Sequence, residues 1–319
     1  MFSDLRPDEV HRAAERIAGH AVRTPLLRSG PLSAVAGGDV YLKLENRQVT
    51  GSFKLRGALN ALATLPASAK RRGVVASSAG NHGLGVAYAA KALGIAATIF
   101  VPNTAPEVKK SGIRALGATL DDGQPDYDAA MVAAKAFGDA RGLTFINPCL
   151  GDMLLAGQGT VAREILEELP GLGTLVVCVG GGGLLGGCAS LLRHEAPQVR
   201  IVGAQSVETA AMAKSLAAGH IVDIPVTPTL ADGLAGQIDD EALDIGRHAL
   251  DDIALLTESE IGRTIAWLHA NHDLKVEGAG AVATGAVLFR KSEIAFPAAV
   301  IVSGGNIDDA KWTSLLQTV

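Results

Sequence analysis

The sequence predicts an α/β protein with two domains, each with a mostly parallel twisted sheet flanked by helices, and an active site in the cleft between them. Three observations predict this fold. Short apolar stretches alternate with helical stretches along nearly the whole chain, which is the order of parallel βαβ units. The composition is 48% hydrophobic with 38 glycines, as expected of strands buried on both faces beneath closely packed helices. These units supply more strands than one sheet usually holds, which indicates two sheets.

Each expected strand in the first half of the chain precedes an expected helix. The pairs of residue ranges are 40–44 with 55–65, 74–77 with 83–93, 97–101 with 107–116, 118–120 with 127–137, and 143–146 with 159–169. After a glycine-rich loop the alternation resumes and ends in a strand over 298–302 and a final helix. Ligands of such sheets bind beyond the carboxyl ends of the strands, where the polar and glycine-rich segments of this chain lie.

The order of these elements also predicts how the domains divide. We expect residues 73–147 to form a small mobile domain that closes over the substrate and excludes water. Residues 1–72 and 148–319 would together form a large, discontinuous domain that carries the glycine-rich loop.

Charge and cysteine content exclude several classes of partner. The net charge is −5 with no basic block, so nucleic acid and anionic membranes are poor partners. No apolar run approaches the roughly 18 residues that span a bilayer, and the N-terminus lacks the pattern of a signal peptide. The three cysteines, Cys149, Cys178 and Cys188, show no metal-ligand spacing. Together these features predict a cytoplasmic protein.

The most informative segment is the glycine-rich loop over residues 180–187, which follows the apolar run 175–179. A strand, a glycine loop and a helix in this order direct several backbone N–H groups at one anion, so the loop predicts a phosphate site. The loop formally matches the dinucleotide-binding fingerprint. However, the next strand, 200–204, ends in Gln205 rather than in the acid that would bind the ribose. A nicotinamide-dependent dehydrogenase is therefore the weaker alternative.

Three further polar segments follow expected strands, and each has an ordinary structural explanation when taken alone. Lys54 would lie in the first turn of a helix capped by Ser52, and if desolvated it could act as a base or nucleophile. Asn81 could cap a helix, and His82 could be a buried structural histidine. The segment 303–308 could be a capping loop.

Taken together, these segments are similar to those of one family. The matching stretches are 23–26, 51–58, 78–82, 156–160, 180–183 and 303–306. In this order they resemble the pyridoxal-phosphate enzymes of the tryptophan-synthase-β fold group (fold type II). Within that group they resemble the branch of serine/threonine dehydratases (ammonia-lyases) and serine racemases.

The resemblance implies a role for each segment. Lys54 would carry pyridoxal 5′-phosphate covalently and, when released, remove the Cα proton of the substrate, while Ser303 would face the pyridine nitrogen. The other cofactor-binding residues would be Phe53, Asn81, Gly180, Gly181, Gly182, Gly183, Leu184 and Glu277. The loop that holds the substrate carboxylate would be Ser78, Ala79, Gly80, Asn81 and His82.

The resemblance also implies the reaction. A neutral hydroxyl opposite the pyridine nitrogen does not enforce protonation of the ring, which favours prompt loss of a β-leaving group. We therefore expect dehydration and deamination of L-threonine, L-serine or both, to 2-oxobutanoate or pyruvate plus ammonia. A homodimer is expected from the resemblance alone.

Some positions depart from the family and leave alternatives open. Racemases carry a serine where this chain has Ala79, so dehydration is favoured, although Ser78 keeps serine racemisation as an alternative. After strand 200–204, Glu208 stands without a second carboxylate, and we expect no divalent metal there. The unusual segment 147–152 leaves the substrate open, and segments 229–233 and 277–280 resemble those of dehydratases that act on other β-hydroxy amino acids. The alternative substrates are 3-hydroxyaspartate, a hydroxyectoine-derived amino acid or a phenylserine-like compound. A ligand-binding protein without catalysis is the remaining alternative.

Overall fold

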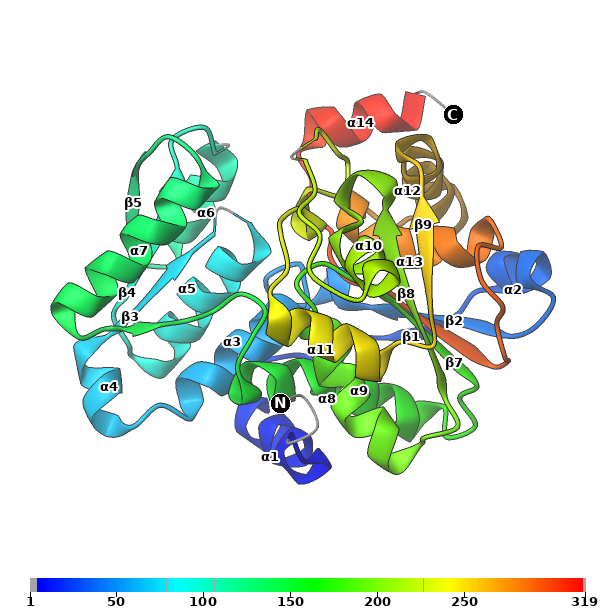
Figure 1. Cartoon of the computed structure of the whole chain (residues 1–319), viewed down its shortest axis with the longest axis horizontal. Coiled ribbons are helices and arrows are strands. Elements are labelled where there is room, and N and C mark those ends of the chain that lie inside the picture. The colour runs from blue at the N-terminus through cyan, green and yellow to red at the C-terminus, as the bar shows by residue number, and fades with distance from the viewer. Residues whose placement is uncertain (1–4, 79, 106, 226, 318–319) are drawn as a thin grey trace.

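The computed structural model describes residues 5–78, 80–105, 107–225 and 227–317. Two separate sheets, one of six strands and one of four, organise the chain into two lobes (Figure 1). The predicted α/β fold class with two mostly parallel sheets is confirmed by this arrangement.

The six-stranded sheet has the order β1-β2-β10-β7-β8-β9. Its strands are β1 (Leu26–Arg28), β2 (Val40–Leu44), β7 (Thr174–Cys178), β8 (Arg200–Ser206), β9 (Asp252–Leu256) and β10 (Ala298–Val302). Only the edge pair β1–β2 is antiparallel. The central strands β7 and β10 are buried at every position, as expected for a sheet covered by helices on both faces.

The four-stranded sheet has the order β5-β4-β3-β6 and is parallel throughout. Its strands are β3 (Val74–Ser77), β4 (Ala97–Pro102), β5 (Thr119–Gln124) and β6 (Thr144–Phe145). All four therefore fall within the range 73–147, although the limits and the mobility of a small domain stay a prediction.

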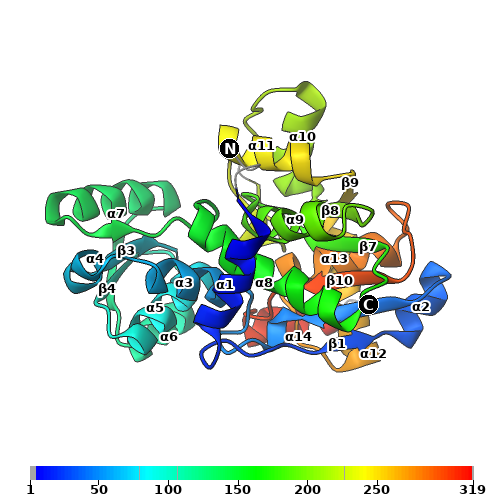
Figure 2. The same ribbon diagram turned by 90° about the horizontal axis from the view of Figure 1, so that it is seen from below.

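Helices cover both sheets (Figures 1 and 2). Their bounds are α1 Pro7–Ile17, α2 Gly30–Ala36, α3 Lys54–Ala63, α4 Ala67–Arg72, α5 Asn81–Leu93, α6 Glu107–Ala115, α7 Tyr127–Arg141, α8 Asp152–Glu168, α9 Gly183–Glu195, α10 Ala211–Ala218, α11 Asp240–Ala249, α12 Glu258–His272, α13 Gly278–Leu288 and α14 Asp309–Gln317. Short 3₁₀ turns are η2 Glu45–Arg47, η3 Val207–Thr209 and η4 Asp232–Leu234. Within the described residues, none of these helices has the length and apolar character needed to cross a bilayer.

Helix α3 lies at the junction of the lobes. On the four-stranded sheet, α7 covers one face, and α3 and α5 cover the other (Figure 2). The apolar side chains Leu55, Leu59 and Leu62 of α3 are buried in the same cluster as the α5 side chains. The first residue of α3, Lys54, is therefore held beside the space between the two sheets.

Two helices begin at least five residues earlier than the sequence predicts. Helix α8 starts at Asp152, ahead of the predicted 159, and α9 starts at Gly183, inside the predicted loop 180–187. Glycines in these helices allow close helix packing. A Cβ on Gly157 would lie 2.5 Å from the Arg56 carbonyl oxygen, and one on Gly187 would lie 2.4 Å from the Leu155 carbonyl oxygen. Such contacts exclude a side chain, so glycine is retained inside both helices.

Candidate active site

The segment just before Lys54 is fixed by backbone hydrogen bonds. The Phe53 N–H donates to the Ser303 carbonyl at 3.1 Å, and the Gly305 N–H donates to the Gly51 carbonyl at 2.9 Å. Ser52 and Gly304 form an isolated antiparallel bridge between these hydrogen bonds. The segment before α3 and the segment after β10 therefore form one unit, as the order of motifs requires.

The Lys54 ammonium lies against the loop that follows β6. Its Nζ donates to the Pro148 carbonyl at 2.7 Å, lies 3.9 Å from Cys149 Sγ, and lies 5.3 Å from the centre of the Phe53 ring. The prediction that Ser52 caps α3 is wrong. Phe53 is the N-cap residue and makes no side-chain cap, while Ser52 Oγ is buried without a partner.

The predicted phosphate loop joins β7 to the first turn of α9. It contains Gly180, Gly181, Gly182, Gly183 and Leu184. Gly182 is the N-cap with φ +83°, a conformation that favours glycine, and it provides no side-chain cap. A Cβ on Gly181 would lie 2.7 Å from Cys149 Sγ. The first-turn N–H groups of α9 thus lie beside a tightly packed glycine segment. This arrangement suits a phosphate at a helix N-terminus.

A chain of side-chain hydrogen bonds links the two lobes. Asn81, the first residue of α5, donates from Nδ2 to Glu277 Oε1 at 2.6 Å. Asn306 donates from Nδ2 to Asn81 Oδ1 at 2.7 Å and to the Thr50 carbonyl at 2.8 Å. A Cβ on Gly304 would lie 2.2 Å from Glu277 Oε1, so this network requires glycine there.

Glu277 is the carboxyl of this network. It is 6% exposed at the start of α13. Burial raises its pKa to about 7, and the negative charge of Asp232 acts in the same direction. The Asn81 hydrogen bond and the charges of Lys109 and Lys54 oppose that shift. Glu277 can therefore gain or lose a proton near neutral pH beside the predicted cofactor site.

The predicted carboxylate loop leads into α5 and includes its first two residues. Ser78 Oγ accepts the Gly80 N–H at 3.1 Å, while Ala79 lies outside the described residues. His82 is buried, and its Nε2 bonds the Ile146 carbonyl at 3.0 Å. Burial, with a further contribution from the Lys54 charge, lowers the His82 pKa to about 3. His82 is thus neutral, and the positive end of α5 is the feature of this loop that suits a carboxylate.

The residues present fit pyridoxal phosphate. Among the residues that the structure describes, four buried polar atoms of the converging segments have no protein partner: Thr50 Oγ1, Ser52 Oγ, Ser77 Oγ and His82 Nδ1. Ser303 Oγ, in the position predicted to face the pyridine nitrogen, donates a long 3.3 Å hydrogen bond to the Ala279 carbonyl and also lies within hydrogen-bonding reach of the Cys178 thiol. Unsatisfied buried groups in a native site indicate a polar ligand. A phosphate loop, an amine and these groups together match the cofactor, although each residue's role stays a prediction.

Two features of the site were not predicted from the sequence. The Pro148 carbonyl holds the Lys54 amine, and Asn306 orients Asn81. The second had a signal, because Asn306 follows two glycines at the end of a buried strand. The first had none, because a backbone carbonyl carries no mark in the sequence.

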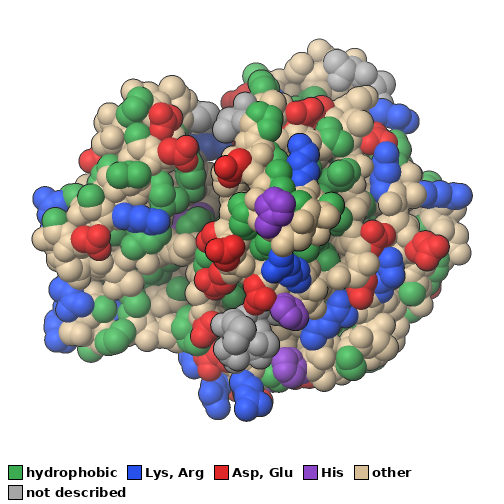
Figure 3. All heavy atoms as spheres, viewed as in Figure 1, with side chains coloured by type: hydrophobic (Ala, Val, Ile, Leu, Met, Phe, Trp, Pro, Cys, Tyr) green, Lys and Arg blue, Asp and Glu red, His purple; other side chains and the backbone are tan. Residues whose placement is uncertain are grey.

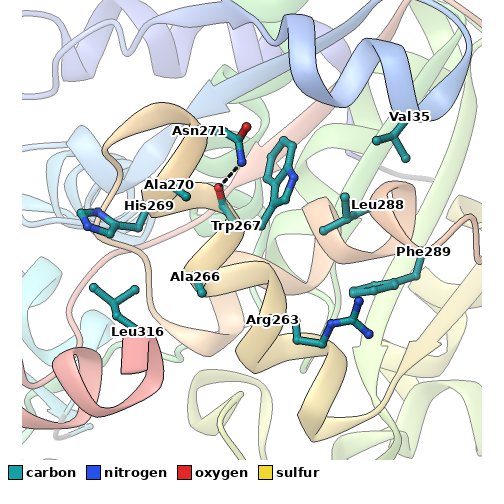
Figure 4. Close-up of a pocket in the computed structure, with 10 residues that line it drawn as sticks. All are labelled: Val35, Arg263, Ala266, Trp267, His269, Ala270, Asn271, Leu288, Phe289 and Leu316. Atoms are coloured by element: carbon teal, nitrogen blue, oxygen red, sulfur yellow. Dashed lines mark hydrogen bonds between the residues drawn. The ribbon is translucent and has the colours of Figure 1, made fainter. Parts of the chain in front are cut away.

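A large surface hollow lies away from these residues. It has a volume of about 560 Å³ and is formed mainly by α12, with contributions from α2, the C-terminal end of α13, and α14 (Figure 4). None of the predicted site residues lines it. A separate hollow lies between the two lobes (Figure 3).

The predicted absence of a divalent metal after β8 stays a prediction. Glu208 Oε2 accepts a hydrogen bond from Thr227 Oγ1 at 2.9 Å. In the part of the chain that the structure describes, no three His, Cys, Asp or Glu side chains are grouped as metal ligands.

Comparison with known proteins tests the family resemblance. Residues 17–304 match the family described as "Pyridoxal-phosphate dependent enzyme". The L-threonine ammonia-lyase of Geobacter sulfurreducens is 39% identical over 301 residues, which are 94% of this chain and 75% of that protein. The Staphylococcus aureus catabolic L-threonine dehydratase TdcB is 36% identical over 315 residues, 97% of this chain and 91% of that protein.

The solved structures give the same result. The structure of maize serine racemase superposes with a TM-score of 0.92 at 32% identity and covers 98% of this chain and 97% of that chain. The predicted cofactor is thereby confirmed: the chain belongs to the pyridoxal-phosphate dependent enzymes of fold type II.

Proposed function

We propose that this protein catalyses the β-elimination of L-threonine, L-serine or both, giving 2-oxobutanoate or pyruvate plus ammonia. The observation that carries the proposal is the Lys54 amine, held by the Pro148 carbonyl beside Cys149, the residue on which the glycine loop packs. The names of its relatives support the substrate class, because threonine ammonia-lyases and dehydratases are 36–39% identical over most of this chain.

In this proposal the protein supplies position and proton transfer. Pyridoxal phosphate, when bound, supplies the electron sink that stabilises negative charge at the substrate Cα. Backbone N–H groups of the glycine loop 180–184 would hold its phosphate, and Ser303 would offer a neutral hydroxyl to its ring. Lys54 would anchor the cofactor and serve as the base for the Cα proton.

The substrate is held by its carboxylate at the start of α5. The N-cap Gly80 makes no side-chain cap, so the first N–H groups of α5 are offered to the carboxylate. Fixing the carboxylate and the amino group together orients the Cα–H bond toward Lys54, which lowers the barrier by orientation. We further propose that residues 73–147 close over the bound substrate and exclude water.

Two finer proposals rest on the family. We propose a homodimer in the cytoplasm. Light scattering on the purified protein tests the first, and a mass of one chain at working concentrations would contradict it. Fractionation of cells that express the protein tests the second.

The experiment that tests the function measures cofactor and products together. The purified holoenzyme should show the visible absorption of bound pyridoxal phosphate and release 2-oxobutanoate from L-threonine. Lys54→Ala should abolish turnover, whereas Lys91→Ala, an exposed lysine on α5, should not. A protein that binds the cofactor but releases no keto acid from any β-hydroxy amino acid would overturn the proposal.

The same assay separates the alternatives. Serine racemase is the second candidate, favoured by the similarity to the maize enzyme, and chiral analysis of L-serine incubations would detect D-serine. Faster keto-acid release from 3-hydroxyaspartate, a hydroxyectoine-derived amino acid or phenylserine than from L-threonine would change the substrate class.

A further inference from the structure

An ion pair crosses the opening between the two lobes. Lys109, in the first turn of α6 on the four-stranded sheet, has its Nζ 3.6 Å from Asp232 Oδ2. Asp232 begins η4, which belongs to the part of the chain around the six-stranded sheet. The side chains are 24% and 54% exposed, so water and a small solute can reach both.

The ion pair lies next to the candidate active site, because η4 packs on two parts of it. A Cβ on Gly180, in the phosphate loop, would lie 3.2 Å from Leu234 Cα. A Cβ on Gly233 would lie 3.1 Å from the Ala279 Cβ, just after Glu277. The charges of Asp232 and Lys109 also both act on the Glu277 carboxyl, in opposite directions. Both charges therefore influence the Glu277 carboxyl, which accepts a hydrogen bond from the Asn81 amide.

The neighbouring charges of α6 are satisfied within their own lobe. Lys110 donates to the Asn103 carbonyl at 2.9 Å and pairs with Asp122 at 3.1 Å. Glu107 and Arg114 pair along the helix at 2.6 Å. Lys109 instead pairs with Asp232, which lies in the other lobe.

We propose that Lys109 and Asp232 form a charge filter that sets which substrate side chains the enzyme accepts. This deepens the proposed function and rests on it. While paired, the two charges cancel, which favours uncharged side chains such as those of threonine and serine. Without the Asp232 charge, Lys109 is an unpaired cation beside the bound substrate, and it attracts a side chain that carries a carboxylate.

The Asp232→Asn variant tests this filter with little structural disturbance. Asp232 Oδ1 accepts the Gly233 N–H at 2.9 Å, and asparagine keeps that acceptor while losing the charge. We expect the kcat/KM ratio of 3-hydroxyaspartate to threonine to rise about tenfold, equivalent to about 1.4 kcal/mol. Lys109→Met in the same background should cancel the gain. Glu107→Gln, which removes an exposed charge from the same helix, should leave the ratio unchanged.

A binding measurement separates failure of this inference from failure of the proposed function. Calorimetry of the holoenzyme with succinate and with butyrate needs no turnover. Asp232→Asn should increase the affinity for succinate about tenfold relative to the affinity for butyrate. An unchanged succinate-to-butyrate ratio, or an equal change in Glu107→Gln, would overturn the charge filter. Wild-type protein that releases no keto acid from threonine but follows the binding prediction would overturn only the proposed reaction.

Discussion

Removing the charge of Glu164 should destabilise this protein far more than removing a neighbouring charge on the same helix. Glu164 accepts hydrogen bonds from Arg56 at 2.7 and 2.9 Å and from Lys43 at 2.6 Å. The second carboxylate of the cluster is Glu45, which binds Arg56 at 2.8 Å. Lys43 and Arg56 are 0% and 1% exposed. Glu164→Gln therefore leaves two buried cations facing one buried anion.

The magnitude follows from that imbalance. Breaking a buried ion pair by removing one partner costs about 3–5 kcal/mol, because the remaining charge stays desolvated. The matched control is Glu167→Gln, one turn further along α8. Its carboxylate is 40% exposed and pairs with Arg23 and Arg163, so the loss should be below about 1 kcal/mol.

The assay is urea denaturation of both variants, monitored by two probes so that a single transition can be verified. The free energy of unfolding at acid pH gives a second measurement. Burial alone would raise the pKa of Glu164, but the hydrogen bonds and charges of Arg56 and Lys43 outweigh it and leave the pKa below 4.5. Its stabilisation is thus present above pH 4.5 and is lost as the pH falls through the folded-state value. Glu164→Gln should therefore reduce the pH dependence of the free energy of unfolding in this acid range.

The reasoning is refuted if Glu164→Gln costs no more than Glu167→Gln. The result also bears on the site, since Arg56 lies two residues after Lys54 in α3. A loosened cluster should lower kcat together with stability, whereas the surface control should lower neither.

Three further results are expected from the contacts of the site and the helices. Gly304→Ala would put a Cβ 2.2 Å from Glu277 Oε1, and we expect kcat/KM to fall at least about tenfold, measured by keto-acid release. Burial raises the Glu277 pKa to about 7, so its contribution to stability falls as pH rises from 4.5 to about 7; Glu277→Gln should remove that slope from urea titrations across this window. Gly187→Ala would put a Cβ 2.4 Å from the Leu155 carbonyl oxygen and should cost about 1–3 kcal/mol by urea denaturation. Gly171→Ala, where a Cβ has nothing within 4 Å, is its control and should cost far less.

The sheets and the phosphate loop could be predicted because their signals are local. A short apolar run followed by glycines specifies both a buried strand and a backbone anion site, as 174–183 does. The start of α8 could not be read in this way. The sequence predicts a helix that begins at Gly159, yet α8 already contains Gly157. Arg56 and Gly187 approach Gly157 and Gly159 closely from other elements. Only tertiary contacts distinguish these two uses of glycine.

The site shows the same division. The Lys54, Asn81 and Ser303 segments could be predicted because each follows a strand. The strands before Lys54 and Ser303, β2 and β10, are parallel neighbours in one sheet, whereas Asn81 follows β3 of the other sheet. The wrong prediction of a Ser52 cap arose because serine before a helix is the usual signal for one, whereas here Ser52 bridges to Gly304. Lys109 gave no signal, since an ion pair between two lobes depends on how the lobes meet.

Helix α3 constrains any closing movement of the small lobe. Its apolar side chains are buried with those of α5, while Arg56 is tied to Glu45 beside the six-stranded sheet. A rigid rotation that carried α3 along would break this buried ion pair and displace Lys54. Gly85 of α5 meets α3 so closely that a Cβ there would lie 3.2 Å from the Lys54 backbone. The closure that we propose would therefore need α5 to slide across a stationary α3, a shear between packed helices rather than a hinge.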